Sequence, residues 1–81
     1  VDVPEEEKFD IVRRAVEYFT SRREVIGVDG ARVLFGDGWG LIRASNTQPI
    51  LVTRYEARSS ERLTEIRDEM EGWLRTQGVT I

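Results

Sequence analysis

Residues 43–47 (RASNT) concentrate polar side chains that could bind an anion. Arg43 offers a planar fork of N–H groups that suits two oxygens of a phosphate. Ser45 and Thr47 supply hydroxyl donors, and the Asn46 amide supplies two N–H groups. A tight loop also turns backbone N–H groups toward one point, which forms an anion nest. These residue types predict a phosphate-binding loop that needs no lysine.

The same run also fits an ordinary turn between two strands. Ser45, Asn46 and Thr47 precede Pro49, and such short polar side chains can bond their own backbone. Arg43 at the end of a strand could pair with an acidic neighbour. From residue types alone, the binding loop and the structural turn therefore both stay open.

The composition of the 81-residue chain excludes most other chemistry. Without cysteine there can be no disulfide, thiol nucleophile or thiolate metal site, and without histidine the commonest general base and metal ligand is missing. No nucleophile–base pair is visible among the other residues. Asp37, between Gly36 and Gly38, is one carboxylate and cannot make a magnesium site, so it is interpreted as a turn residue. We expect no catalytic residue and no metal site in this chain.

Net charge and hydropathy restrict the partners. Twelve basic and fifteen acidic residues give a net charge of −3 without a basic block. Nucleic-acid binding needs a positive face, so such a chain is a poor candidate for it. No apolar run approaches the roughly 18 residues of a membrane span, and no signal peptide is visible. We expect a cytoplasmic protein that binds neither nucleic acid nor membrane.

Helical periodicity appears at both ends of the chain. A helix is predicted over residues 4–22, with Pro4 at its first position. Its core-facing stripe is expected to contain Phe9, Val12, Val16 and Phe19, and the flanking residues Ile11, Ala15 and Tyr18 widen it. A second helix is predicted to begin after a cap at Ser59 or Ser60 and to end near Gly78. Its core residues are expected to be Leu63, Ile66, Met70, Trp73 and Leu74.

Between the helices the period changes to two, which is typical of strands. Asp29 and Gly30 predict a two-residue type I′ turn between the first two strands. Gly40 inside the third strand indicates a bulge or a close backbone contact. Residues 79–81 could return as a last edge strand. The predicted strands cover residues 25–28, 31–35, 39–44 and 50–58. This order predicts an α+β fold in which a four-stranded antiparallel sheet carries two helices packed on one face.

The run 38–52 (GWGLIRASNTQPILV), followed by 54–57 (RYEA), resembles the C-terminal domain of the phosphomannomutase/phosphoglucomutase enzymes of the α-D-phosphohexomutase superfamily. The similarity covers the chain from about residue 26 to residue 74. Glucosamine-phosphate mutases carry a related loop with proline in place of Ala44 and glycine in place of Asn46. The sequence therefore resembles the mannose/glucose branch, although Thr53 stands where the family commonly has a larger aliphatic residue.

The resemblance implies a fold like that of the TATA-box-binding protein, as in the family's last of four domains. By similarity, Arg43, Ser45, Asn46 and Thr47 would hold the phosphate of a mannose or glucose phosphate. The family moves a phosphoryl group between the 1- and 6-positions through a bisphosphorylated intermediate, and the sugar turns around between the half-reactions. A clamp that holds only phosphate suits both orientations, because its task is positioning and electrostatics.

The resemblance also implies that this chain is the C-terminal phosphate-binding domain of a longer enzyme, a single domain over residues 1–81. The phosphoserine loop, the Mg²⁺ loop and the loop that reads the sugar lie in the preceding domains, its expected partners. We therefore expect no cofactor in this fragment and no activity from it alone. The alternative is a stand-alone protein-interaction domain of the same fold without a catalytic role.

Overall fold

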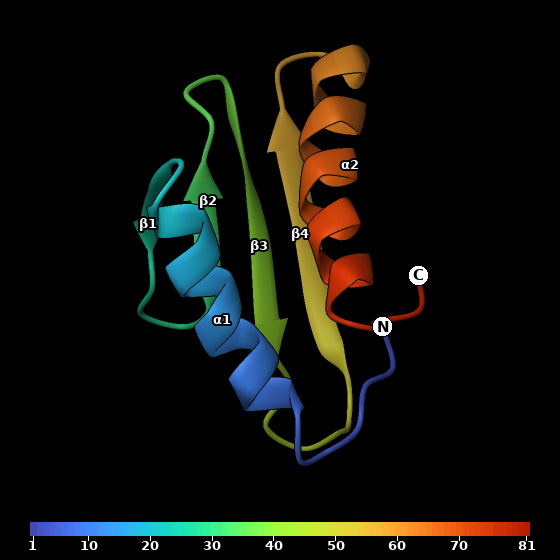
Figure 1. The fold of residues 1–81 in the computed structure, drawn as a ribbon. Helices are drawn as coiled ribbons and strands as arrows, with labels where there is room; N and C mark the ends of the chain where they lie inside the picture. Colours follow the sequence, from blue (N-terminus) through green and yellow to red (C-terminus); the bar gives the residue numbers. More distant parts are fainter.

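The computed structural model describes residues 1–81 as two helices and four strands (Figure 1). In chain order these are α1 (Lys8–Thr20), β1 (Glu24–Ile26), β2 (Ala31–Leu34), β3 (Gly38–Ala44), β4 (Leu51–Ala57) and α2 (Ser60–Thr76). The strands form one antiparallel sheet in the order β1-β2-β3-β4, so each strand pairs with its neighbour in sequence. The predicted α+β fold is confirmed.

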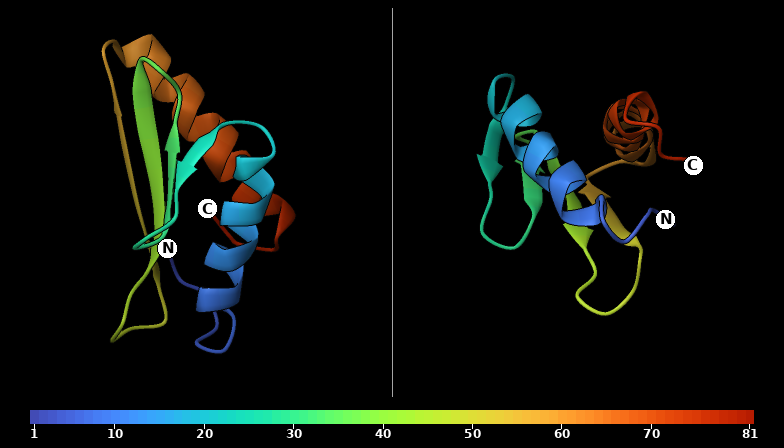
Figure 2. Two further views of the ribbon diagram at one scale, coloured as in Figure 1. Left: turned by 90° about the vertical axis from the view of Figure 1, so that its left-hand side faces the viewer. Right: turned by 60° about the horizontal axis from the view of Figure 1, so that its bottom comes forward.

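Both helices cover the same face of the sheet, and the core lies between the two layers (Figures 1 and 2). Strand residues alternate between this core and the open face. Ile42 of β3 is fully buried beneath the helices, whereas its neighbour Arg43 is only half-buried. The predicted close contact at Gly40 is confirmed, because a Cβ there would overlap the side chain of Met70 on α2. The register runs through Gly40 without a bulge.

Helix α1 faces the sheet with a different stripe from the predicted one. Its buried residues are Lys8, Ile11, Ala15 and Phe19. Phe9, predicted to lie in the core, is 58% exposed, and Val12 and Val16 are half-buried. The helix is therefore rotated by about one residue from the prediction. A period of 3.6 residues shows that one side of a helix is apolar. When apolar residues also stand at the adjacent positions, the period does not determine which of them face the sheet.

Helix α1 also begins four residues later than predicted. Residues 5–7 form a turn in which the Glu7 amide donates to the Pro4 carbonyl at 3.0 Å. The segment before it is extended, because the Val3 amide donates to the Pro49 carbonyl at 3.0 Å and Asp2 forms an antiparallel bridge with Ile50. The chain needs this turn to leave the sheet before α1 can begin.

The connection between β1 and β2 is longer than the predicted type I′ turn. The last pair joins Ile26 to Arg32, and residues 27–30 connect the two strands. A type I′ turn needs positive φ at both central residues. Gly30 has a φ of +146°, but Asp29 does not have a positive φ, because only glycines do in this chain. The prediction of a two-residue turn is wrong.

Local signals placed the ends of α2 correctly. The Ser59 hydroxyl accepts a hydrogen bond from the Arg62 amide at 3.1 Å, as a helix cap does. Gly78, with a φ of +85°, follows the end of the helix. Residues 79–81 form no strand, however. The Val79 amide donates back to the Leu74 carbonyl at 3.3 Å and its side chain enters the core, so the predicted last strand is wrong.

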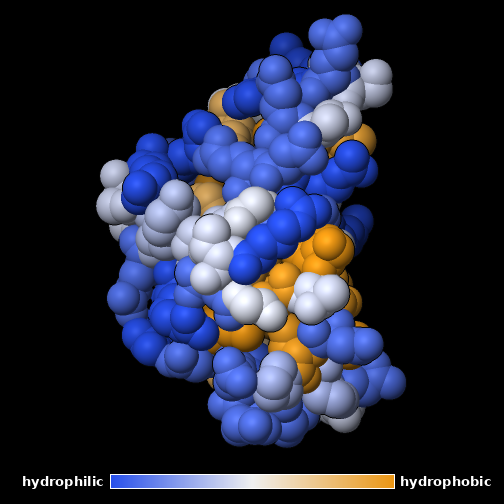
Figure 3. Space-filling view, turned by 45° about the vertical axis from the view of Figure 1, so that its right-hand side comes forward, coloured by the Kyte–Doolittle hydropathy of each residue, from blue (hydrophilic) through white to orange (hydrophobic).

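The surface is mostly hydrophilic. In Figure 3, hydrophilic residues cover most of the face that is shown, and hydrophobic residues gather in one patch in its lower half. Neither helix combines the length and the apolar character that a membrane span requires.

Candidate functional site

The loop that carries the predicted binding residues joins β3 to β4 at the lower end of the sheet in Figure 1. Its stem is the last pair of the two strands, Ala44 with Leu51. The Ser45 amide donates to the Ile50 carbonyl at 3.1 Å, and the Ile50 amide donates to the Gln48 carbonyl at 2.8 Å. The loop is therefore closed by its own backbone.

The Ser45 side chain organises the inside of this loop. Its Oγ accepts hydrogen bonds from the Thr47 amide at 3.3 Å and from the Gln48 amide at 3.2 Å. This is the turn that the alternative interpretation of the sequence described. The Ser45 hydroxyl keeps its own hydrogen, which it can donate outward. Asn46 and Thr47 have exposed side chains and carry donors at the tip of the loop. The turn geometry and an anion cradle therefore fit the same residues.

Arg43 is the cation of the site and has no internal partner. It lies on β3 opposite Val52, two residues before the loop, and its side chain is half-buried. No ion pair and no side-chain hydrogen bond joins its guanidinium to another residue, although the other sequence interpretation allowed an acidic neighbour. A guanidinium without a partner keeps all its N–H donors available for an anion.

Arg43 and Asn46 meet in a cleft of about 830 Å³ between α1, the β1–β2 connection and the end of β3. Ser45 and Thr47 are not among its lining residues, so the structure brings only two of the four predicted residues to this cleft. The sequence analysis missed its apolar wall, which consists of Phe9, Val12, Val16 and Val28. The signal for this wall in the sequence was Val28, an apolar residue that lies between Gly27 and Gly30.

The second arginine of the cleft differs from Arg43 because it is paired. Arg13 forms ion pairs with Asp10 and, at 2.6 Å, with Glu17 on the same helix. Its hydrogen bond to Asp10 is the main reason why the pKa of that carboxyl lies below its ordinary value. Glu17 and Asp29 also line the cleft, so its formal charge is balanced. Of the two arginines that line the cleft, only Arg43 is outside an ion pair.

Gly30 lets the β1–β2 connection approach Arg43 closely. A Cβ at this position would lie 2.6 Å from the Ile42 carbonyl oxygen and 3.2 Å from the Arg43 Cα. Its φ of +146° is also one that residues with a side chain rarely adopt. Only glycine therefore permits this wall of the cleft beside Arg43.

Residues 1–81 contain no group of three or more acidic side chains that could hold a metal ion. Asp37 lies in the β2–β3 turn, as predicted, and the sequence analysis missed its partner. Arg62 Nε donates to both oxygens of Asp37 at 2.9 and 3.0 Å, and this bond is the main cause of the lowered pKa of the carboxyl.

Both the sequence and the fold of this chain match known proteins. A family model described as "Phosphoglucomutase/phosphomannomutase, C-terminal domain" matches residues 1–72. A phosphomannomutase/phosphoglucomutase of Pseudomonas putida is 42% identical over 71 residues, which are 84% of this chain and 15% of the relative. The enzyme of that name from Pseudomonas aeruginosa is 37% identical over 78 residues, or 93% of this chain and 16% of the relative.

Two further matches extend the comparison. A probable phosphoglucosamine mutase of Methanopyrus kandleri is 40% identical over 70 residues, which are 85% of this chain and 16% of the relative. The crystal structure of a phosphoglucomutase/phosphomannomutase family protein from Burkholderia thailandensis superimposes with a TM-score of 0.65 at 34% identity. The match covers 79% of this chain and 15% of that structure. The chain therefore spans less than a fifth of the length of the relatives it matches.

Proposed function

The chain belongs to the phosphoglucomutase/phosphomannomutase family, in which it matches the C-terminal domain, and we propose that its β3–β4 loop holds the phosphate of a phosphosugar in a longer enzyme. The enzyme would move phosphate between the 1- and 6-positions of mannose or glucose through a bisphosphorylated intermediate. Residues 1–81 would be its C-terminal phosphate-binding domain and would be inactive alone. The preceding domains would supply the chemistry, in the cytoplasm.

One observation carries this proposal: the guanidinium of Arg43 has no internal partner, and Arg43 is among the residues that line the cleft next to the loop. In the bound state, Arg43 donates to two phosphate oxygens. The Ser45 and Thr47 hydroxyls and the Asn46 amide complete the cradle. Such a clamp contacts phosphate alone, so it serves both orientations of the sugar equally. Its contribution is to position and to stabilise charge, which is most of what phosphoryl transfer asks of a protein.

This chain does not fit a magnesium site. It has no acidic cluster, and the carboxylate of Asp37 is already engaged by Arg62. Any Mg²⁺ of the enzyme would be held by its other domains. The role proposed for the loop involves no step through the metal.

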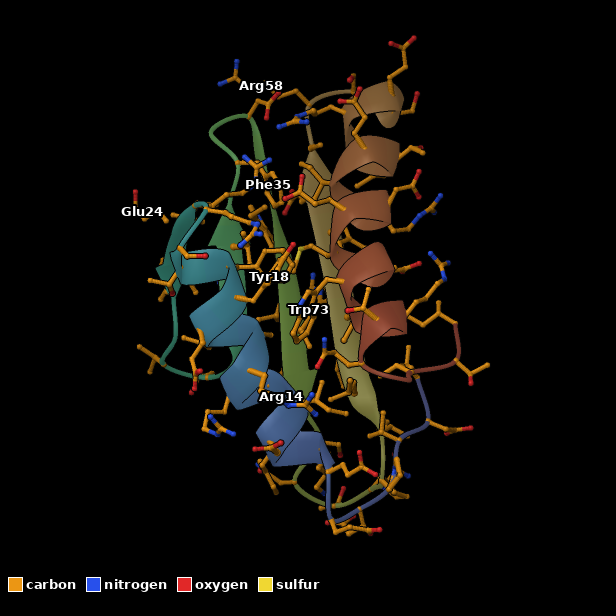
Figure 4. All side chains as sticks on the ribbon, viewed as in Figure 1. Arg14, Tyr18, Glu24, Phe35, Arg58 and Trp73 are labelled. Atoms are coloured by element: carbon orange, nitrogen blue, oxygen red, sulfur yellow. The ribbon has the colours of Figure 1, made fainter.

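The experiment replaces Arg43 by alanine in the full-length enzyme that carries this chain. The kcat/KM for glucose 1-phosphate and mannose 1-phosphate is expected to fall, because the phosphate loses its charged donor. Arg58→Ala is the matched control, since Arg58 is exposed at the opposite end of the sheet (Figure 4). The proposal fails if Arg43→Ala leaves kinetics unchanged or if Arg58→Ala has the same effect.

The competing function is that of a protein-interaction domain. Ile26 and Val28, exposed by 45% and 84%, lie at the edge of the sheet and favour it. NMR titration of the chain distinguishes the two. Inorganic phosphate should shift only the resonances of residues 43–48 if the loop is a clamp. A protein partner that shifts β1 and the open sheet face, together with a loop that ignores phosphate, would support the competitor.

A further inference from the structure

Lys8, the only lysine of the chain, is completely buried although it carries a charge. It is the first residue of α1, and its Nζ donates to the Gln48 carbonyl oxygen at 3.1 Å. The same Nζ pairs with the Glu5 carboxylate at 2.9 Å. A buried ammonium group is costly unless it is paired and hydrogen-bonded. The two acceptors meet that condition, and one of them belongs to the β3–β4 loop.

The Gln48 carbonyl is a central point of this loop. It accepts from both the Ile50 amide and Lys8, while the Gln48 amide donates to the Ser45 Oγ at 3.2 Å. The orientation of this residue is therefore linked to Ser45 on one side and to the return into β4 on the other. Gln48 therefore connects Lys8 to the Ser45 hydroxyl through two successive hydrogen bonds.

The segment before α1 supports the loop from the same side. The Val3 amide donates to the Pro49 carbonyl at 3.0 Å, and the Leu51 amide donates to the Val1 carbonyl at 2.8 Å. Residues 1–8 therefore bond to the backbone of three residues where the loop returns into β4: Gln48, Pro49 and Leu51. Lys8 is the only one of these contacts made by a side chain, so only its contribution can be removed by substitution.

We infer that Lys8 is a positioning residue of the β3–β4 loop, which it holds in the geometry that binds phosphate. This inference rests on the proposed function of the loop. Lys8 does not act as a direct ligand: its Nζ is engaged by two acceptors, its side chain is buried, and it does not line the cleft of Arg43 and Asn46. It acts through Gln48 and Ser45, and its charge is balanced by Glu5.

The test compares Lys8→Met, which keeps the unbranched side chain as far as Cε and removes Nζ, with Ile11→Val. Ile11 is a buried residue one turn further along α1, and shortening it loosens the core without touching the loop. Glu5→Gln is the second control, because it keeps the bond from Lys8 to Gln48. In each 81-residue variant, NMR measures amide exchange at Ser45 and Ile50 and the Kd for inorganic phosphate.

Lys8→Met should speed exchange at Ser45 and Ile50 about tenfold relative to amides in the centre of β3, since a charged hydrogen bond is lost. It should also raise the Kd for phosphate by at least about threefold, while Ile11→Val and Glu5→Gln bind like the wild type. Unchanged exchange and Kd in Lys8→Met overturn the inference, as does an equal effect of Ile11→Val.

A wild-type loop that ignores phosphate would count against the proposed function, and the exchange rates would still decide whether Lys8 positions the loop. If Lys8→Met does not fold, the single lysine allows a measurement on the wild type. Lysine labelled with ¹⁵N at Nζ gives one ammonium signal. Its protons should exchange at least about tenfold more slowly than those of free lysine. Exchange as fast as in free lysine overturns the inference.

Discussion

Replacing Arg43 by alanine should lower kcat/KM for the phosphosugar about a hundredfold. Arg43 can place two parallel N–H bonds on a phosphate, and a hydrogen bond to a charged group contributes about 1.5–3 kcal/mol. Because the side chain is only half-buried, the lower figure applies, and two such bonds give about 3 kcal/mol. At 1.36 kcal/mol for each factor of ten, this loss corresponds to roughly two orders of magnitude in rate.

Arg43→Lys separates charge from geometry. Lysine keeps the positive charge but offers a point donor in place of the planar fork, so about half of the loss, or roughly a tenfold fall in kcat/KM, is expected. The assay is steady-state kinetics of the full-length enzyme with glucose 1-phosphate. A variant Arg43→Lys that equals the wild type would show that the fork contributes nothing.

Stability provides the control for both variants. The Arg43 guanidinium makes no internal hydrogen bond or ion pair, so its removal should change the free energy of unfolding by no more than about 0.5 kcal/mol. Urea unfolding measures this difference. The reasoning is refuted if Arg43→Ala unfolds much more readily than the wild type, or if its kcat/KM stays within about twofold of the wild-type value.

Three further predictions concern stability. Gly30→Ala should cost about 1–3 kcal/mol in urea unfolding, because it combines a positive φ with a Cβ 2.6 Å from the Ile42 carbonyl oxygen; an unchanged midpoint would contradict this. Tyr55→Phe should stabilise the chain by about 1 kcal/mol, because the buried Tyr55 hydroxyl has no hydrogen-bond partner. Burial also raises the pKa of Tyr55, so the wild type should lose stability above about pH 10, where the unfolded phenol ionises, and the variant should lose less. Glu69→Gln removes the negative charge and one of the two oxygens that accept from Arg23 at 2.9 Å, and it should cost about 0.5 kcal/mol at pH 7, since both side chains are partly exposed. The hydrogen bond from Arg23 lowers the pKa of Glu69, so this contribution should vanish as the pH falls through that value, and thermal unfolding at pH 7 and pH 2 should show it.

Helices and caps were predictable because their signals are local. The Ser59 cap and the helix end before Gly78 depend on residues within one turn of each other. The rotation of α1 was not predictable in this way. Both candidate stripes are apolar, and the choice depended on how Ile11 and Ala15 pack against the sheet.

The β3–β4 loop was also predictable only in part. The sequence alone supplied the residue types of an anion cradle, and it also described the turn that Ser45 forms with the Thr47 and Gln48 amides. It could not decide whether Arg43 had an acidic partner. That depended on which side chains lie near the end of β3, and the structure pairs none of them with Arg43.

By itself, then, the sequence determined the α+β fold class and the family resemblance that the comparisons confirmed, because these follow from short-range patterns and a contiguous motif. Only the tertiary structure decided that Phe9 faces outward, that Arg43 and Asn46 share a cleft, and that Lys8 donates to the Gln48 carbonyl. Lys8 and Gln48 are forty residues apart in the chain. Contacts over such distances arise from how helices and sheet pack together, and a local pattern carries no record of them.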